Sequence, residues 1–284
     1  MERQSGKSMR PERPSLPCAL ACALAIGGLD PGGGAGILAD LRAFAAAGAF
    51  GCAAVTLTTA QSTAGLKSVR YVRSREVTLQ AEEVLQSQRV RAVKVGALGS
   101  RENVRAVARL LLRHAAIPVV VDTPMRPTRG RARLLADDAL ATVRRELLPR
   151  ATLVTVNLLE AQALVGAKVR TLGEAHDAAR LLCDTGARAA LIKGGHMTGR
   201  DAIDVLAMDG EVIELRASRL TIGPTHGTGC TFASLIAGRL AVRTRPRRVH
   251  RDDLVAAIRW AKRVHHAALA RTVDVGRGMR VMVF

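Results

Sequence analysis

The chain has 284 residues, of which 48% are hydrophobic and 2% aromatic, and its formal net charge is +19 at pH 7. This length fits one α/β domain of ordinary size, with a core built from alanine, valine and leucine. The excess charge is mostly arginine spread along the chain, without aromatic residues to stack on bases and without a nucleic-acid-binding motif. We therefore expect a basic, solvated surface and no specific nucleic-acid partner.

The cysteines and the N-terminal residues bear on where the protein resides. Five cysteines without C-x-x-C spacing indicate neither a disulfide framework nor a zinc site, which favours the cytoplasm. Residues 1–26 resemble a secretory signal peptide, but cleavage there would remove the strand that must precede a glycine-rich loop. We predict a disordered basic tail over residues 1–17 and a single domain over residues 18–284. No apolar run reaches the length of a membrane span, so no membrane partner is expected.

The first predicted strand leads directly into a glycine-rich loop. Residues 19–26 are continuously apolar, which is typical of a strand buried on both faces. The loop over residues 27–36 lacks the glycine spacing of a Rossmann dinucleotide site. A helix is predicted over residues 37–48, with Asp40 near its start. A carboxylate in that place either compensates the helix dipole or contacts a ligand, and both interpretations stay open.

The following stretch alternates between the strand and helix patterns. Strands are predicted over residues 51–58, 69–72, 90–95 and 118–122, and helices over residues 77–88 and 101–113. Such alternation indicates a parallel sheet covered by helices on both faces. In sheets of this kind, ligands bind beyond the carboxyl ends of the strands.

The second half continues this alternation. Beyond an arginine-rich loop over residues 125–133, the predicted elements are a helix at 137–148, strands at 151–155 and 189–193, a helix at 175–185, a hairpin of 204–208 and 212–215, and a helix at 253–269. Several residues lie at or after the carboxyl ends of predicted strands, namely Gln61, Gly96, Asp122, Asn157 and Lys193. Because these strands end at the same edge of the sheet, the residues are predicted to converge with the glycine-rich loop on one site.

The stretch GPTHGTGCTFA, residues 223–233, precedes a helical pattern of apolar residues. Gly227 and Gly229 allow a tight turn and close approach of a ligand to the backbone. The free N–H groups and the dipole at the start of the helix favour an anion there. Cys230 lies at this helix start, where the pKa of a thiol is expected to be lowered, although a small residue that simply fits the turn is the alternative.

Six segments in order, GGLDPGGGAGILADL, TTAQST, KVGAL, VTVNLLEA, IKGGHM and THGTGCT, resemble those of the hydroxymethylpyrimidine and phosphomethylpyrimidine kinases of thiamin synthesis. The resemblance covers about residues 20–270. It implies the ribokinase-like fold, an α/β structure of three layers with a mostly parallel central sheet between helices. It also implies phosphorylation, by ATP with Mg²⁺, of the hydroxymethyl group of an aminopyrimidine and then of its monophosphate. A homodimer is also expected.

The resemblance implies roles for the residues that match the family's motifs. The implied catalytic residues are those of the anion hole and its neighbours, namely Gly227, Thr228, Gly229, Cys230 and Lys193, with Cys230 in the place of the base. The implied aminopyrimidine-binding residues are Gly28, Asp40 and Gln61. The implied nucleotide-binding residues are Asn157, Glu160, Lys193, Gly195 and His196. Asn157 and Glu160 would also hold Mg²⁺ through water.

Three departures from the family's pattern leave the substrate open. The family's DPVMVAKSG reads DTPMRPTRG over residues 122–130, so Thr128 replaces a lysine and Arg129 is the expected cation for the nucleotide. Ala97 replaces a methionine, which would enlarge the pyrimidine pocket. The triplet TPN becomes TVN at residues 155–157. A pyridoxal or pyridoxine kinase on the same scaffold, and a pyrimidine-binding regulator without turnover, remain alternatives; a nucleic-acid-binding protein is a weaker third.

Overall fold

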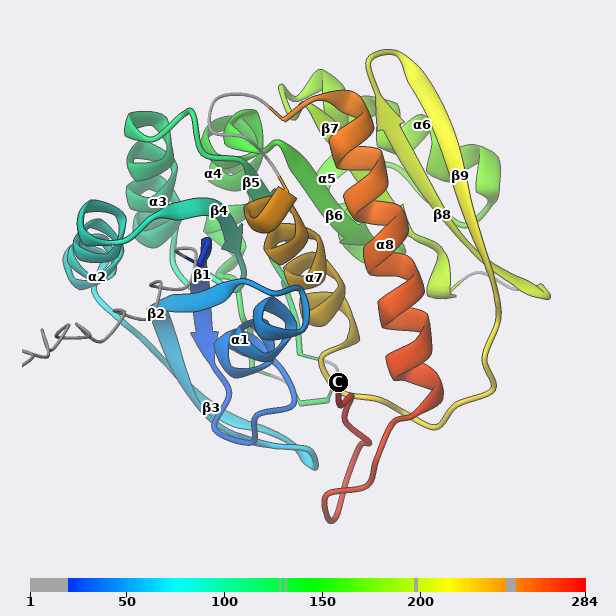
Figure 1. Cartoon of the computed structure of the whole chain (residues 1–284), viewed down its shortest axis with the longest axis horizontal. Coiled ribbons are helices and arrows are strands. Elements are labelled where there is room, and N and C mark those ends of the chain that lie inside the picture. Colours follow the sequence, from blue (N-terminus) through cyan, green and yellow to red (C-terminus); the bar gives the residue numbers. More distant parts are fainter. Residues whose placement is uncertain (1–19, 128, 131, 197–198, 244–248) are drawn as a thin grey trace, which may run out of the picture.

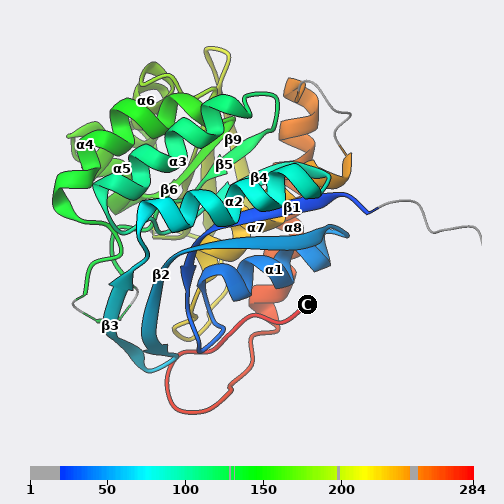
Figure 2. The ribbon, with the colours of Figure 1, turned by 90° about the vertical axis from the view of Figure 1, so that its left-hand side faces the viewer.

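The computed structural model describes residues 20–127, 129–130, 132–196, 199–243 and 249–284, and the predicted tail over residues 1–17 lies outside this part of the chain. Its centre is a nine-stranded sheet in the order β3-β2-β1-β4-β5-β6-β7-β8-β9. The strands are β1 (Cys22–Leu29), β2 (Phe50–Ser62), β3 (Gly65–Tyr71), β4 (Val90–Val95), β5 (Val119–Val121), β6 (Leu153–Asn157), β7 (Ala189–Lys193), β8 (Asp201–Met208) and β9 (Glu211–Ser218). Helices cover both faces of the sheet (Figures 1 and 2), which confirms the predicted three layers.

The sheet is mostly parallel, as predicted. The strands from β2 through β1, β4, β5 and β6 to β7 pair in parallel. The hairpin partner β3 runs antiparallel to β2, and β8 and β9 each run antiparallel to the preceding strand. The carboxyl ends of the parallel strands therefore meet at one edge, and the residues that follow them come close together.

The helices form two layers. One layer, in front of the sheet in Figure 1, consists of α1 (Gly36–Ala46), α7 (Thr228–Arg243) and α8 (Arg251–Ala270). The other consists of α2 (Ser74–Ser87), α3 (Arg101–Arg113), α4 (Leu140–Thr142), α5 (Leu158–Val165) and α6 (Leu172–Asp184). None of the helices in the described ranges combines the length and the apolar character that crossing a membrane requires.

The apolar run of β1 explains why this strand lies in the middle of the sheet. The side chains of Ala23, Leu24, Ala25 and Ile26 are all fully buried. Because successive strand residues point to opposite faces, Leu24 and Ile26 join the core beneath α2 and α3, and Ala23 and Ala25 join the core beneath α1 and α7. Alanine on the second face leaves room for α7 to pack closely against the sheet.

The first two strands extend beyond their predicted ends. The prediction ended the first strand at residue 26, but β1 continues to Leu29, which pairs with Thr58 after a bulge between Gly27 and Gly28. The prediction ended the second strand at residue 58, but β2 continues to Ser62 because its last residues pair with β3. Backbone pairing with a neighbour, which apolar periodicity does not report, extends both strands.

The single helix predicted over residues 137–148 is wrong in detail. This stretch consists of short 3₁₀, α and π turns, namely Asp137–Ala139, Leu140–Thr142, Val143–Leu147 and Leu148–Arg150. Ala139, Val143 and Leu147 are nevertheless fully buried at four-residue spacing. The apolar spacing predicted the buried face correctly, because burial selects a face and not a particular backbone hydrogen-bond pattern.

Candidate active site

A cavity of about 950 Å³ opens where the parallel strands end. The five residues predicted to converge at this edge all line it, namely Gln61, Gly96, Asp122, Asn157 and Lys193. The lining also includes most other residues to which the family resemblance gives a role, namely Gly28, Asp40, Glu160, Gly195, Gly227, Thr228, Gly229 and Cys230. The structure thus brings these distant segments together around one space.

Two residues predicted to bind nucleotide are not placed in this lining. Arg129 is exposed, and its carbonyl oxygen accepts a hydrogen bond from the Leu66 N–H at 3.2 Å, beside the β2–β3 hairpin. Arg126, earlier in the same loop, lines the cavity. Within the described part of this loop, the cation at the cavity is therefore Arg126. The side chain of His196 lies outside the described part of the chain.

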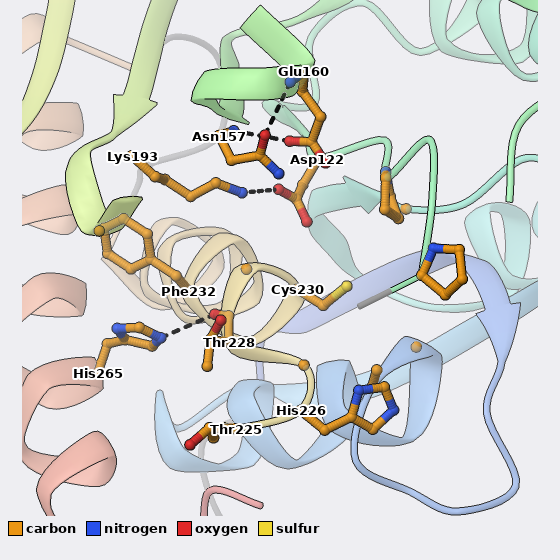
Figure 3. Close-up of a pocket in the computed structure, with 18 of the residues that line it drawn as sticks. Asp122, Asn157, Glu160, Lys193, Thr225, His226, Thr228, Cys230, Phe232 and His265 are labelled. Carbon is orange, nitrogen blue, oxygen red and sulfur yellow. Dashed lines mark hydrogen bonds and ion pairs between the residues drawn. The ribbon is translucent and has the colours of Figure 1, made fainter. Parts of the chain in front are cut away.

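The turn before α7 permits only glycine at one position. Gly227 has a φ of 73°, and a Cβ there would lie 1.9 Å from the carbonyl oxygen of Gly34 in the glycine-rich loop. The two loops therefore pack backbone against backbone. The helix α7 begins at Thr228, and its first residues line the cavity (Figure 3). The unpaired N–H groups of this first turn make it a site for an anion such as a phosphate.

A buried ion pair lies beside the start of α7. The Lys193 ammonium donates to Asp122 Oδ1 at 2.7 Å, and the Thr155 hydroxyl donates to the same oxygen at 3.0 Å. Burial alone would raise the pKa of Asp122, but Lys193 and Lys94 outweigh it and hold this pKa below its usual value. Asp122 is therefore an anion that keeps Lys193 charged and close to the cavity.

Asn157 and Glu160 cap the start of α5. The Asn157 Oδ1 accepts from the Glu160 N–H at 2.9 Å, and Glu160 Oε2 accepts from the Asn157 N–H at 2.8 Å. This reciprocal capping box fixes both side chains at the end of β6. Burial raises the pKa of Glu160, an effect that the Lys193 ammonium opposes. The two residues thus present a rigid amide and carboxyl group at the cavity.

Two of the carboxylates suit a divalent cation shared with phosphates. Among the described residues, no group of three or more His, Cys, Asp or Glu side chains is arranged to hold a metal by protein ligands alone. Mg²⁺ usually takes one or two carboxylates and completes its shell with water and substrate phosphates. Asp122 and Glu160, which both line the cavity, provide oxygen donors of that kind.

Cys230 lies in the first turn of α7 and points into the cavity (Figure 3). Burial raises the pKa of its thiol to about 12, and the Lys94 ammonium opposes this shift only in part. The expectation of a lowered pKa is therefore wrong. A helix terminus contributes only about 0.3–1 kcal/mol to a nearby charge, which is too little to offset the desolvation of a thiolate. The nearby carboxylates of Asp122 and Asp40 raise the pKa further.

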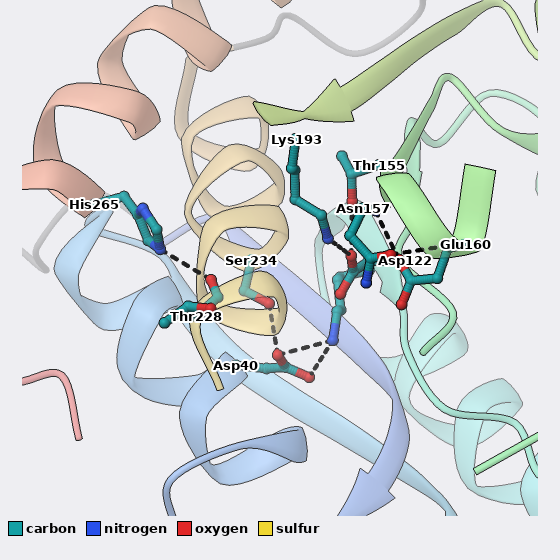
Figure 4. A network of polar contacts seen from close by, with 10 residues as sticks. Asp40, Asp122, Thr155, Asn157, Glu160, Lys193, Thr228, Ser234 and His265 are labelled. Atoms are coloured by element: carbon teal, nitrogen blue, oxygen red, sulfur yellow. Dashed lines mark hydrogen bonds and ion pairs between the residues drawn. The ribbon is translucent and has the colours of Figure 1, made fainter. Parts of the chain in front are cut away.

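Asp40 belongs to a buried network beneath α7 (Figure 4). Its side chain is fully buried, and both carboxylate oxygens accept hydrogen bonds from the Lys94 ammonium at 2.9 Å. The Ser234 hydroxyl donates to Asp40 Oδ1 at 2.7 Å. Ser234 lies one helical turn after Cys230, so this network supports the face of α7 that carries the thiol. Sequence reasoning had recognised the segment KVGAL without giving Lys94 a role.

Another group of polar residues lies at the end of the cavity near α8. The Lys262 ammonium donates to Asp204 Oδ2 at 2.6 Å, and Asp204 Oδ1 accepts from the Gly194 N–H at 2.9 Å. The His265 Nε2 lies 2.9 Å from the carbonyl oxygen of Thr228. Burial lowers the pKa of His265 to about 4, so its imidazole is neutral and donates to that oxygen. His265 therefore fixes the backbone at the start of α7.

Sequence reasoning did not find these residues. Asp204 and Lys262 are 58 positions apart, and no local spacing indicates that they meet. Asp30 and His226 also line the cavity and lie within the recognised segments GGLDPGG and THGTGCT. Their contact could not be predicted, because the motifs assign roles to the neighbouring glycines and do not indicate that positions 196 residues apart meet.

Comparison with known proteins places this arrangement in a family. Residues 30–282 match the protein family described as phosphomethylpyrimidine kinase. The chain is 39% identical over 263 residues to a hydroxymethylpyrimidine/phosphomethylpyrimidine kinase of Rhizobium meliloti, covering 91% of this chain and 94% of that one. It is 39% identical over 256 residues to a bifunctional thiamine biosynthesis protein of Geobacter sulfurreducens, covering 90% of this chain and 50% of that one.

The fold is shared with a solved structure. The pyridoxal kinase of Bacillus subtilis in complex with ADP superposes with a TM-score of 0.81 at 27% identity, covering 93% of this chain and 97% of that one. The similarity extends over nearly the whole length of both proteins.

Proposed function

The chain belongs to the phosphomethylpyrimidine kinase family, and we propose that its cavity transfers the γ-phosphate of ATP first to a hydroxymethylpyrimidine and then to the resulting monophosphate. The protein is a phosphotransferase of thiamine biosynthesis, as its relatives are. One observation carries the proposal: the first turn of α7 and the Lys193–Asp122 ion pair lie next to each other in the lining of a single cavity. Phosphoryl transfer needs mainly positioning and neutralisation of charge, and these two elements provide both.

Different residues along the cavity bind the phosphate, neutralise its charge and accept the proton. The N–H groups at Gly227, Thr228 and Gly229 hold the phosphate in transit, and Lys193 neutralises charge on it. A Cβ at Gly229 would lie 3.0 Å from the Lys193 Nζ, so the two groups reach the same space. In its thiolate form, Cys230 receives the proton of the substrate hydroxyl as the bond from that oxygen to the γ-phosphorus forms and the bond from the γ-phosphorus to the departing ADP oxygen breaks.

Mg²⁺ is the cofactor that we propose for this site. When bound, it would neutralise negative charge on the phosphates. Asn157 and Glu160 would hold it through water, and Asp122, which lines the same cavity, would provide a further carboxylate. The capping box keeps Asn157 and Glu160 in place before any ligand binds.

The two substrates occupy opposite ends of the cavity. We assign the aminopyrimidine to the end lined by Gly28 and Gln61, and the nucleotide to the end lined by Gly195. Arg126 supplies the loop cation to the nucleotide phosphates, in place of Arg129. Asp40 acts in the site indirectly, through its ion pair with Lys94, because its own carboxylate is buried and paired.

A pyridoxal kinase is a second candidate. Ala97 lines the cavity with Gly28 and Leu57, and its small side chain leaves room for a ring with larger substituents. The ADP complex of a pyridoxal kinase shares the fold. The higher identity, 39% over 263 residues, belongs to a pyrimidine kinase, which favours the pyrimidine. Membership of a kinase family also favours catalysis over a regulator without turnover.

A substrate panel tests the proposal. Wild-type protein with ATP and Mg²⁺ is given hydroxymethylpyrimidine, its monophosphate, pyridoxal and pyridoxine, and the products are identified by mass spectrometry. The first two are expected to be phosphorylated, and chelation of Mg²⁺ is expected to stop the reaction. Lys193→Ala should lower kcat by about 10²–10³-fold, whereas Lys168→Ala, at an exposed site outside the cavity, should not change it. Absence of product from all four compounds would contradict the proposal.

Three further assignments remain proposals. We propose that residues 18–284 act as one domain, which the single nine-stranded sheet supports. We propose a cytoplasmic location, which the four free cysteines among the described residues support. We also propose a homodimer, which sedimentation equilibrium tests directly.

A further inference from the structure

A buried polar cluster joins three segments at the pyrimidine end of the cavity. The His226 Nε2 lies 2.9 Å from Asp30 Oδ2 and 3.0 Å from the amide nitrogen assigned to Gln61. Asp30 comes from the glycine-rich loop, Gln61 from the end of β2, and His226 from the loop before α7. Asp30 and His226 are each only 3% exposed. All three residues line the cavity.

The surroundings of Asp30 decide which nitrogen of His226 carries the proton. Asp30 Oδ1 accepts from the Gly32 N–H and Oδ2 from the Ala35 N–H, both at 2.9 Å. Burial would raise the pKa of Asp30, but the hydrogen bonds and the charge interaction with His226 outweigh it and lower this pKa. An ionised carboxylate only accepts, so the His226 Nε2 must donate to it.

The proton on His226 in turn orients the amide of Gln61. Two donors cannot face each other, so a protonated Nε2 requires the amide oxygen of Gln61, and not its NH₂, on the side of the imidazole. The NH₂ then takes the other end of the amide. That end has no hydrogen-bond partner among the described residues, and it belongs to a side chain that lines the cavity. A ligand at this position therefore meets an N–H donor.

The backbone around His226 prevents the cluster from rearranging. A Cβ at Gly34 would lie 2.4 Å from the His226 Cδ2, so the imidazole is packed directly beneath the glycine-rich loop. The His226 N–H donates to the Arg280 carbonyl at 2.8 Å, which ties the residue to the C-terminal segment. The His226 Nδ1 is buried without a partner among the described groups. A bare lone pair at Nδ1 is consistent with the proton on Nε2.

We propose that Asp30 and His226 are positioning residues that present the NH₂ group of Gln61 to the substrate ring, and that the pocket thereby selects a ring with an unprotonated nitrogen at that point. This inference rests on the proposed function, because it concerns the substrate end of the same cavity. It adds a specificity rule: the recognised group is a hydrogen-bond acceptor. A ring with C–H or N–H in that place leaves the Gln61 donor unpaired and binds more weakly.

Binding of two deaza analogues tests the rule without requiring turnover. In each analogue, one of the two pyrimidine ring nitrogens of hydroxymethylpyrimidine is replaced by C–H, and affinity is measured by calorimetry without ATP. Wild-type protein is expected to bind one analogue about tenfold more weakly than the parent compound. In Asp30→Asn an amide replaces the carboxylate that orients His226, so this difference is expected to fall to about twofold or less. The proposal is overturned if Asp30→Asn discriminates between the parent compound and the analogue as strongly as wild type does. It is also overturned if wild type binds both analogues as tightly as the parent compound.

Kinetic and spectroscopic measurements separate positioning from a general structural effect. Asp30→Asn is expected to raise the KM for the pyrimidine while the KM for ATP is unchanged. His176→Asn is the matched control, because His176 pairs with Glu214 at 3.0 Å in a similar histidine–carboxylate contact outside the cavity. It should retain the discrimination of wild type. Gln61→Met is the second variant if Asp30→Asn does not fold, and it should lose the discrimination.

The tautomer of His226 is measured independently of any ligand. Imidazole ¹⁵N chemical shifts of histidine-labelled protein, assigned through the signal lost in His226→Asn, are expected to show the proton on Nε2. A proton on Nδ1 alone overturns the proposal. If the parent pyrimidine does not bind while His226 carries its proton on Nε2, the proposed function fails and the positioning of Gln61 stands.

Discussion

Burial and the position at a helix start have opposite effects on the pKa of the Cys230 thiol. The start of α7 favours a thiolate, but burial has the larger effect and raises the pKa to about 12. The thiol is therefore protonated near neutral pH in the free protein. A base with so high a pKa acts only through the small fraction of the thiol that is ionised. At pH values below the pKa, this fraction increases tenfold with each unit by which the pH rises.

The first prediction concerns Cys230 and pH. If the thiolate is the base, kcat of wild type should rise steadily from pH 7 to pH 9.5, because a raised pKa leaves the thiol mostly protonated throughout. Cys230→Ser should lose about 10²–10⁴-fold in kcat and should show no such rise, because a serine hydroxyl does not ionise in this range. Steady-state kinetics at saturating ATP measure both effects.

Two outcomes would contradict this role of Cys230. A serine variant as fast as wild type would show that the thiol only fills the turn. A flat profile in wild type, together with a slow serine variant, would show that the protonated thiol contributes without acting as a base. Substrate affinity should be similar in both proteins, since the change is confined to one atom.

At the scale of elements, the order and type of most strands and helices could be predicted from apolar periodicity. The bounds of β4, α3 and β7 agree with the predictions to the residue. In each of these, the apolar pattern ends at the same residue as the backbone hydrogen bonding. β2 and α6 differ because other interactions set their ends. The antiparallel partner β3 prolongs β2, and a capping box between Thr171 and Glu174 starts α6 earlier.

The candidate site could be predicted where the chain direction alone brings residues together. Asp122 follows a parallel strand, and Asn157 and Lys193 are the last residues of two others, so the topology places them at one edge. The partners of Asp40 and His226 could not be predicted, because Lys94 and Asp30 reach them through side-chain contacts between distant segments. Burial, which reversed the expected pKa of Cys230, is likewise a property of the assembled fold.

The C-terminal segment links two parts of the site. It runs past the tip of the β2–β3 hairpin, as the red trace of Figure 2 shows. The Met279 N–H donates to the Thr63 carbonyl at 2.9 Å, and the Arg280 N–H donates to the Pro224 carbonyl at 3.0 Å. The hairpin that carries Gln61 and the loop that carries His226 are therefore held by the same strap, which we define as residues 277–281.

The second prediction tests this strap with paired glycine variants. A Cβ at Gly278 would lie 2.4 Å from the Thr63 carbonyl carbon and oxygen, at a φ of 132°. Gly276 has a similar φ of 135° with nothing within 4 Å of its Cβ position. Both alanine variants should lose about 1–3 kcal/mol of unfolding free energy from backbone strain. Only Gly278→Ala should also raise the KM for the pyrimidine. Equal KM values in the two variants would show that the strap does not support the site.

At the scale of the whole molecule, part of the basic charge gathers where three arginines of α7 and α8 lie close together. Arg239 stacks over Trp260 at 4.8 Å from its ring centroid, between α7 and α8. Partial burial lowers the pKa of Arg239, and the neighbouring charges of Arg243 and Arg263 lower it further. Like charges held close together attract anionic polymers without regard to sequence.

The third prediction concerns this charge. The protein should bind a homopolymeric RNA weakly, with a dissociation constant of about 10⁻⁴–10⁻⁶ M at physiological salt. Raising KCl from about 50 to 200 mM should weaken this binding by an order of magnitude or more, while the KM for the pyrimidine stays the same. Fluorescence anisotropy of labelled RNA measures the effect. Tight binding that is insensitive to salt would support a specific nucleic-acid role.

The late position of α7 in the chain has a consequence for synthesis on the ribosome. Ala23, Ala25, Ala92 and Val120 form one face of the sheet, and α7 covers it. Roughly a hundred residues separate Val120 from the start of that helix, and at about 5–20 residues per second their synthesis takes roughly 5–20 s. During this interval the nascent sheet exposes the part of this apolar face that α1 does not cover. Slow translation of this interval would therefore prolong the exposure of an aggregation-prone intermediate, and nascent chains that stop before residue 228 would be substrates for chaperones.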